Sequence, residues 1–209
     1  MTRSGTIATG GGATRRAPGK RYRFGALVLA ALALAALPAA AWSSDEGIVV
    51  KVRKDGPQIF VDVDCPVDAP WAIVWEVLTD YDHMAEFIPN LRQSGVTERA
   101  DNVLRVRQSG KVTRGLMTFA FDNVREIELV PQKEVRSRLV SGDLKASNFV
   151  TRIVEVAARI HIVNGGSYTP NFWVPPVIGP LLIEEETRKQ YGQIRTEILR
   201  RSALLRPAL

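Results

Sequence analysis

The sequence predicts an α+β protein in which a curved antiparallel sheet of about six or seven strands covers a long C-terminal helix, with short helices after the first main strand. Three observations support this fold class. Runs of alternating apolar and polar residues, separated by turn residues, fill most of the chain between residues 48 and 169. A short helical repeat interrupts them near Trp71. A long amphipathic repeat runs from Pro180 to about Arg201.

The first 41 residues have the composition of a secretory signal peptide. Six basic residues and no acidic residue precede Phe24, and the segment from Phe24 to Trp42 carries no charge. Three alanines follow Pro38 and fit the small-residue cleavage site. We therefore expect a signal peptide over 1–41, an exported protein (periplasmic or secreted) and a folded domain over 42–209. The alternative is an uncleaved membrane anchor over 24–42, since this run is about the shortest that can span a bilayer.

Charge and cysteine content exclude some classes of function. Six of the 28 basic residues lie before residue 42, so the rest of the chain holds 22 basic residues against 22 acidic ones. This balanced domain lacks the basic footprint that nucleic-acid binding requires. The single cysteine, Cys65, excludes an internal disulfide, and its place in an alternating strand pattern predicts a small buried side chain.

The first two strands are predicted over 48–53 and 59–63, on either side of the turn sequence Asp55-Gly56-Pro57. A helix should follow, with Asp68 as its N-cap and Pro70 in its first turn. Its apolar stripe has helical spacing and consists of Trp71, Val74, Trp75 and Leu78. The pair Pro89-Asn90 ends helical structure.

From residue 91 to about 169 the chain predicts successive antiparallel strands, because the connections between them are too short for parallel crossovers. Leu104 and Val106 fit the core side of one strand, which places Arg105 and Arg107 on the outside. Further strands are expected around 117–121 and over 135–140, 146–156 and 159–163. His161 alternates with apolar neighbours and should lie on the solvent face.

A helix is narrower than a curved sheet, so the space between the sheet and the final helix need not be filled by side chains. The layout therefore predicts a cavity with apolar walls. Ile183, Tyr191 and Ile194 lie on the apolar stripe of the final helix, which faces the sheet.

The stretch VDCPVDAPWAIVWEVLTDYDHMAEFIPNL (63–91) resembles the START-like helix-grip (SRPBCC) superfamily, in particular its polyketide cyclase/dehydrase and coenzyme Q-binding types. The resemblance is carried by Ala69-Pro70, Val74-Trp75, Asp80-Tyr81 and Phe87-Ile88-Pro89-Asn90, and later by Ser141-Gly142-Asp143. It extends over about 48–202. The chain differs at Asn148-Phe149, where a tryptophan is common in such proteins.

The resemblance implies a protein that binds or carries a hydrophobic small molecule (a lipid, an isoprenoid quinone or a polyketide-like compound) without a cofactor. Apolar and aromatic residues around the expected cavity are the candidate ligand contacts. They are Trp75, Tyr81, Phe87, Ile88, Met117, Phe119, Phe121, Phe149, Tyr168, Phe172, Trp173, Ile183, Tyr191 and Ile194. The alternative interpretation is that the same residues form an ordinary packed core without a ligand.

The alternative function is a cyclase, aromatase or dehydratase. Tyr81 and His83, with Tyr168, would then be the acid/base candidates, since histidine and tyrosine can transfer protons. The alternative to this catalytic role is a structural one, in which the Asp80–His83 segment ends the helix. Two histidines and one cysteine are too few for a typical zinc site, and the GxSxG, P-loop and GxGxxG motifs are absent.

The segment 164–176 contains two glycines, three prolines and aromatic residues that a loop leaves accessible. Within it, 171–176 predicts either a lid over the cavity or an edge that touches a membrane, because Trp and Phe favour both settings.

Overall fold

The computed structural model describes residues 47–114 and 117–205 of the 209-residue chain. All of them lie in one compact unit, Ala41–Leu209. The predicted signal peptide over 1–41 lies outside the described residues. No helix within 47–114 and 117–205 combines the length and the apolar composition that crossing a bilayer requires.

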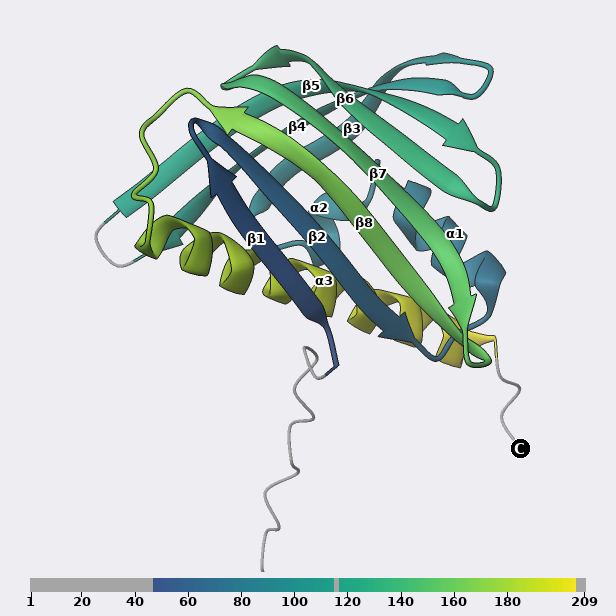
Figure 1. The fold of residues 1–209 in the computed structure, drawn as a ribbon. Coiled ribbons are helices and arrows are strands. Elements are labelled where there is room, and N and C mark those ends of the chain that lie inside the picture. The colour runs from purple at the N-terminus through teal and green to yellow at the C-terminus, as the bar shows by residue number, and fades with distance from the viewer. Residues whose placement is uncertain (1–46, 115–116, 206–209) are drawn as a thin grey trace, which may run out of the picture. The chain divides into compact units, whose positions relative to one another are not determined.

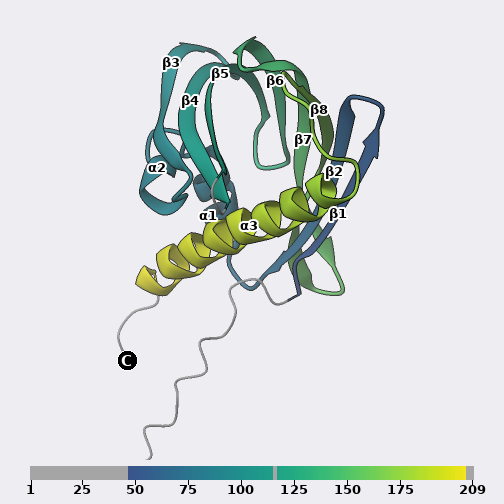
Figure 2. The same ribbon diagram turned by 90° about the vertical axis from the view of Figure 1, so that its left-hand side faces the viewer.

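Eight antiparallel strands form one sheet, in the order β1-β2-β8-β7-β6-β5-β4-β3 (Figure 1). The strands are β1 Val49–Asp55, β2 Gln58–Val67, β3 Leu91–Ala100, β4 Val103–Arg114, β5 Met117–Val130, β6 Glu134–Gly142, β7 Leu144–Val156 and β8 Arg159–Pro170. The helices are α1 Trp71–Thr79, α2 Met84–Phe87 and α3 Ile178–Leu204. Figure 2 shows the sheet curving over α3, with α1 and α2 below β3 and β4. The predicted fold class, including the short helices after an early strand, is confirmed.

The sheet has one strand more than the upper end of the predicted range. The additional strand is β3, whose residues are mostly exposed and carry few apolar side chains. β3 is an edge strand that pairs only with β4. An edge strand with polar side chains lacks the apolar alternation by which strands are recognised in a sequence, and its polarity discourages pairing between molecules.

The two faces of the sheet differ in chemistry. On the inner face, which α3 covers, Ile59, Val61 and Val63 of β2 are at most 4% exposed. The outward side chains of β5 and β6 form cross-strand ion pairs, such as Arg138–Glu126 at 2.6 Å. Arg105 and Arg107 also lie outside, as predicted, and Arg107 pairs with Asp122 at 2.5 Å. The predicted inward positions of Leu104 and Val106 are confirmed.

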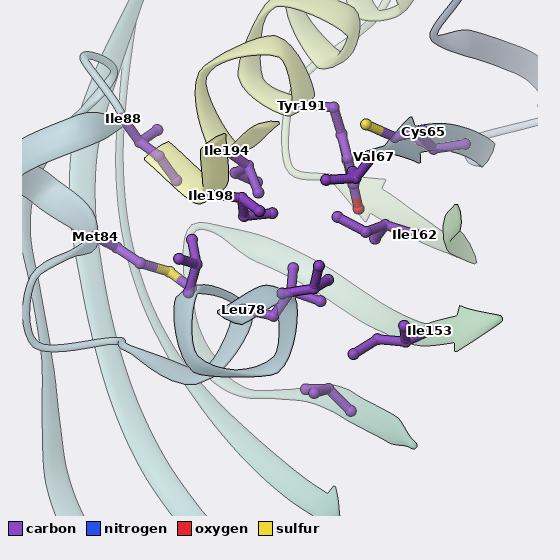
Figure 3. Close-up of a cluster of buried hydrophobic side chains, with 14 of the residues drawn as sticks. Cys65, Val67, Leu78, Met84, Ile88, Ile153, Ile162, Tyr191, Ile194 and Ile198 are labelled. Carbon is purple, nitrogen blue, oxygen red and sulfur yellow. The ribbon is translucent and has the colours of Figure 1, made fainter. Parts of the chain in front are cut away.

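The C-terminal half of α3 packs against the sheet and α1. Tyr191, Ile194 and Ile198 project from α3 into a cluster of buried side chains that includes Ile162 and Leu78 (Figure 3). Cys65 belongs to the same cluster and is 0% exposed, which confirms its predicted burial. Burial raises the pKa of its thiol to about 12, so the thiol stays protonated and unreactive near neutral pH.

The first turn of α1 differs from the prediction. Pro70, and not Asp68, occupies the N-cap position, and no side chain caps the helix. The carbonyl of Pro70 accepts hydrogen bonds from the amides of Ile73 and Val74. Asp68 instead pairs with Arg159 at 2.7 Å and joins the start of α1 to the β7–β8 turn. A tertiary ion pair thus replaces the local cap that the sequence pattern favours.

Replacing Ile198 with alanine should lower the free energy of unfolding by about 2–5 kcal/mol, because truncation of a fully buried side chain leaves a cavity. Leu199→Ala is the matched control. This neighbouring side chain is 42% exposed. Its loss should change the stability by less than about 0.5 kcal/mol. Urea-induced unfolding followed by circular dichroism measures both, and equal losses would contradict this packing.

Candidate functional site

Aromatic side chains gather on the inner face of the central strands. Phe149 on β7 and Tyr168 on β8 lie with ring centroids 6.4 Å apart, tilted by 33°. Gly166, opposite Phe149 in the register, makes room for them. A Cβ atom at Gly166 would lie 2.6 Å from the Phe149 ring, so a larger residue at this position would displace the ring. Phe121 of β5 occupies the same face across from Gly110.

Polar groups lie beside these rings. Ser147 is 2% exposed, and its Oγ has no hydrogen-bond partner among the described residues. In the register it opposes Tyr168, and burial raises the pKa of the Tyr168 hydroxyl to about 12. Further along the same strand pair, Thr151 Oγ1 donates a hydrogen bond to Asn164 Oδ1 at 2.9 Å. The inner face therefore offers neutral hydrogen-bonding groups within an apolar wall.

One charged residue, Arg125 of β5, also belongs to the inner face. It opposes Val106 on β4 and Leu139 on β6. Its Nη1 donates a hydrogen bond to Ser137 Oγ at 3.1 Å. Burial lowers the pKa of Arg125, and the nearby Tyr81 hydroxyl acts in the opposite direction. Tyr81 itself is 8% exposed, and burial raises its pKa.

Several inner-face side chains are not fully covered. Phe121, Phe149, Tyr168, Leu139 and Arg125 are all half-buried, although they lie on the side of the sheet that faces the interior. Ile59, Ile162 and Ile198, by contrast, are each 0% exposed. The inner face thus has a fully packed part and a part with accessible surface.

Two predicted contact residues lie in the packed part. Tyr191 and Ile194 are 9% and 7% exposed and belong to the cluster shown in Figure 3. Burial raises the pKa of Tyr191, while its hydrogen bond with Thr151 acts in the opposite direction. Trp75 on α1 and Ile183 on α3 are partly buried and pack against the same core. Contact of these four residues with a ligand stays a prediction.

The predicted contact residues Phe87 and Ile88 belong to a fixed corner. Phe87 ends α2 and is partly buried, and Ile88 is 3% exposed. Asn90 donates a side-chain hydrogen bond to Glu186 of α3, and its carbonyl accepts from the amide of Lys111. This corner therefore connects α2 and the end of β4 to the N-terminal half of α3.

The loop between β8 and α3 presents its aromatic residues to solvent. Trp173 is 77% exposed and Phe172 is 50% exposed. Val174, which follows them, is 8% exposed and contacts Gly179 so closely that a Cβ atom there would lie 2.3 Å from Val174 Cγ1. The loop is thus anchored at Val174, while Trp173 beside it is largely exposed. Val177, Ile178 and Leu181 extend the exposed apolar surface onto α3, at 74%, 60% and 62%.

Met117 and Phe119 belong to β5, where they pair with Arg114 and Val112, but their side chains lie outside the described part of the structure.

The two acid/base candidates do not come together. Tyr81 is buried near Arg125, whereas the His83 side chain is 58% exposed and its Nδ1 lies 2.6 Å from Asp80 Oδ1. Asp80 in turn pairs with Arg201 of α3 at 2.6 Å. The hydrogen bond with Asp80 raises the pKa of His83. His83 is therefore part of an ion-pair network between α1 and α3, in keeping with the structural interpretation of this segment. Tyr168 lies elsewhere, beside Phe149.

Arg125 was missed because the sequence places it next to Glu126 in a charged run. The signal that could have identified it is the alternation along β5. Phe121, Asn123, Arg125 and Ile127 occupy every second position and therefore share one face. The charge of Arg125 by itself suggests a solvent-exposed side chain, whereas its position in the alternation of β5 places it on the inner face.

A basin of about 560 Å³ lies on the outer face of the sheet. Charged residues of β1, β2, β5 and β6 line it together with mostly uncharged residues of β7 and β8, which include Phe149 and Gly166. Arg53 stacks over the ring of Phe60 at 4.0 Å on one side of it. This basin is distinct from the predicted space between the sheet and α3. His161 is also on the outer face, as predicted, with Nδ1 at 2.6 Å from Asp64 Oδ1.

No group of three or more histidine, cysteine, aspartate or glutamate side chains within the described residues is arranged to hold a metal ion.

Comparison with known proteins agrees with this arrangement. The sequence model of the family described as "Polyketide cyclase / dehydrase and lipid transport" matches residues 67–156. A search of curated proteins found no significant match to this chain.

Solved structures show the same fold at low sequence identity. A STAR-related lipid transfer protein from Xanthomonas axonopodis is 15% identical, with a TM-score of 0.61, over 74% of this chain and 94% of that one. The Zhui aromatase/cyclase from Streptomyces sp. R1128 is 16% identical, with a TM-score of 0.56, over 70% and 94%. A START superfamily protein from Mycobacterium smegmatis is 10% identical, with a TM-score of 0.53, over 70% and 99%.

These matches confirm the resemblance to the START-like helix-grip superfamily and to its polyketide cyclase/dehydrase type. The chain has a START-like helix-grip fold, which a lipid transfer protein and an aromatase/cyclase of known structure also have. Because one fold serves both kinds of protein, the fold alone does not assign the activity.

The stability of the protein should fall as the pH is lowered from about 5 towards 2. Hydrogen bonds from Arg200 and Arg201 outweigh the effect of burial and lower the pKa of Glu197 from 4.5 to about 2. A carboxylate with a depressed pKa stabilises the fold above its unfolded pKa, and this contribution is lost as the pH falls through the folded one. Glu197→Gln should therefore be less stable than the wild type at pH 7.

The check is urea-induced unfolding across this pH range. Glu197→Gln should show a flatter pH dependence than the wild type. Glu185→Gln is the control, because Glu185 pairs with Lys189 on the exposed side of α3, where ion pairs contribute little. A Glu197→Gln profile parallel to that of the wild type would contradict this role.

Proposed function

We propose that this protein binds a hydrophobic small molecule between the inner face of the sheet and α3. The observation that carries the proposal is the half-buried state of Phe121, Phe149 and Tyr168 on the inner face. A filled interior would bury these aromatic side chains, as it buries Ile59 and Ile162. An apolar ligand that covers their accessible surface would gain about 0.8 kcal/mol for each CH₂ group removed from water.

The polar groups on the same face support binding of a molecule with at least one polar atom. Ser147 has a buried hydroxyl without a partner among the described residues. An unpaired buried hydroxyl costs free energy, and a ligand atom that pairs with it would remove that cost. Binding sites of this kind combine apolar walls with a few polar groups that orient the ligand.

Carriage or binding is favoured over the cyclase alternative. Enzymatic proton transfer by Tyr81 and His83 needs both groups at one substrate, yet Tyr81 is buried and His83 is exposed in the α1–α3 network. If the cyclase alternative holds, it must use other groups of the inner face. His83→Ala should therefore leave ligand binding intact.

We propose that the β8–α3 loop, 171–176, contacts a membrane surface while ligand is exchanged. The exposure of Phe172 and Trp173, which continues onto Ile178 and Leu181, supports membrane contact over a closed lid. Phe and Trp favour the boundary between water and lipid, where an apolar ligand would enter and leave.

We further propose that the protein acts outside the cytoplasm, on the basis of the signal-like composition of residues 1–41. Cell fractionation with N-terminal sequencing of the mature protein tests it. A mature protein that begins near residue 42 in the exported fraction supports export. A chain that keeps residues 24–42 and fractionates with membranes supports the anchor alternative.

Filling the interior should weaken ligand binding. Leu139 lies on the inner face opposite Arg125, whereas its neighbour Val140 is 40% exposed. We expect Leu139→Trp to weaken binding of an uncharged fluorophore such as N-phenyl-1-naphthylamine by about tenfold or more, because the indole takes up space beside the rings. Val140→Trp should bind like the wild type. Fluorescence titration of folded variants measures both.

Organic extraction of protein purified from its native envelope, followed by mass spectrometry, should yield a bound apolar compound. Absence of such a compound, together with no binding of the fluorophore by the wild type, would refute the proposed function.

Removing the exposed aromatic pair should reduce binding to membranes. We expect the double variant Phe172→Ser/Trp173→Ser to co-sediment with phosphatidylcholine vesicles at least several-fold less than the wild type, since it loses the apolar surface that would insert. Val156→Ser is the control. Val156 is also 50% exposed, but it lies at the end of β7, next to the start of β8, whereas the tested loop follows the end of β8. Equal sedimentation of the double variant and the wild type would exclude membrane contact through this loop.

A further inference from the structure

Arg125 is a cation in an apolar part of the interior. Its cross-strand neighbours are Val106, which is 0% exposed, and Leu139. The next inward residue along β5, Ile127, is 2% exposed. Arg125 is thus flanked by three aliphatic residues, while its polar neighbours on the same face, Asn123 and Ser137, are uncharged. An arginine is unfavourable in such a place unless its charge is used.

The charge of Arg125 has no counter-charge within residues 47–114 and 117–205. The hydrogen bond that it donates goes to the neutral Ser137 Oγ, and no carboxylate of these residues forms an ion pair with it. The nearby Tyr81 is not an anion, because burial raises the pKa of its hydroxyl and keeps it protonated at neutral pH. Arginine itself remains charged, since its ordinary pKa is far above neutral.

Other arginines of the same strands are paired. Arg138 lies 2.6 Å from Glu126, and Arg107 lies 2.5 Å from Asp122. The buried carboxylate of Glu134 is likewise matched, with Arg136 and Arg152 both at 2.5 Å. The fold therefore balances charges on the outer face and leaves a positive charge inside, which is costly in the absence of an anion.

The groups around Arg125 can donate further hydrogen bonds. The guanidinium has five N–H donors in a planar fork that matches the two oxygens of a carboxylate. Ser137 accepts from Arg125 and can donate its own hydrogen onward, and Tyr81 carries a buried hydroxyl close enough to feel the arginine charge. A ligand atom that meets these donors must be an acceptor, and an anionic acceptor also balances the charge.

We propose that the ligand is an amphiphilic acid, whose carboxylate is held by Arg125 and Ser137 and whose apolar chain covers Phe121, Phe149 and Tyr168. The inference rests on the proposed function and makes it more specific, since it names the chemical class of the ligand. Arg125 thereby selects acids over neutral lipids of the same length.

The test compares ligands that differ only in the head group. Hexadecanoic acid, hexadecan-1-ol and methyl hexadecanoate each displace N-phenyl-1-naphthylamine from the purified protein at pH 8. We expect the wild type to bind the acid at least about tenfold more tightly than the alcohol or the ester. Arg125→Met should bind acid and alcohol equally, and Arg125→Lys should retain part of the preference. Arg107→Met, which removes an outer-face arginine, should keep the full preference.

A second measurement needs no variant and holds even if Arg125→Met does not fold. The acid preference of the wild type should shrink as the pH is lowered below about 5, where free carboxylic acids become neutral. Equal binding of acid and alcohol by the wild type, or an acid preference that survives in folded Arg125→Met, overturns the inference but leaves the proposed function standing. Failure of all three compounds and of the fluorophore to bind overturns both.

Discussion

The contact between one face of α3 and the curved sheet is the interaction on which the rest of the structure depends. A single helix cannot cover a sheet of eight strands evenly, because it is narrower than the concave surface. Its C-terminal half, with Tyr191, Ile194 and Ile198, fills the interior beside α1. The rings of Phe149 and Tyr168 on the central strands keep accessible surface. The same packing therefore stabilises the fold and leaves inner-face surface that a ligand can cover.

Charged residues are also distributed differently on the two faces of the sheet. On the outer face, arginine and glutamate side chains face each other across β5 and β6 and neutralise one another in partial contact with water. Between α1 and α3, Arg201 joins Glu76, Asp80 and Glu197 and ties the last turns of the final helix to the body of the domain. Arg125 differs from these arginines, because its hydrogen-bond partner is a neutral hydroxyl. A charge on the inner face without a counter-charge is a feature of a binding site more than of a stabilising core.

Much of the fold could be predicted from the sequence, because alternation and helical spacing are properties of short segments. The strand that escaped prediction, β3, has a polar edge composition that hides its alternation. The cap of α1 was also misassigned, since Asp68 finds its partner in Arg159, which is far away in the sequence. For the candidate site, Phe121, Phe149 and Tyr168 could be identified as inward aromatic residues. The separation of Tyr81 from His83 could not, because neighbouring residues at a helix end can point in opposite directions.

By itself the sequence determined the class of fold, the balanced charge of the domain, the burial of Cys65 and the inward face of each strand with clear alternation, because each depends on local pattern or composition. Only the tertiary structure decided which inward residues are packed and which retain accessible surface, and that Arg125 lies inside without a carboxylate among the described residues. These properties depend on which distant strands and helices meet. A periodic pattern assigns a residue to a face, but only the packed chain determines what that face contacts.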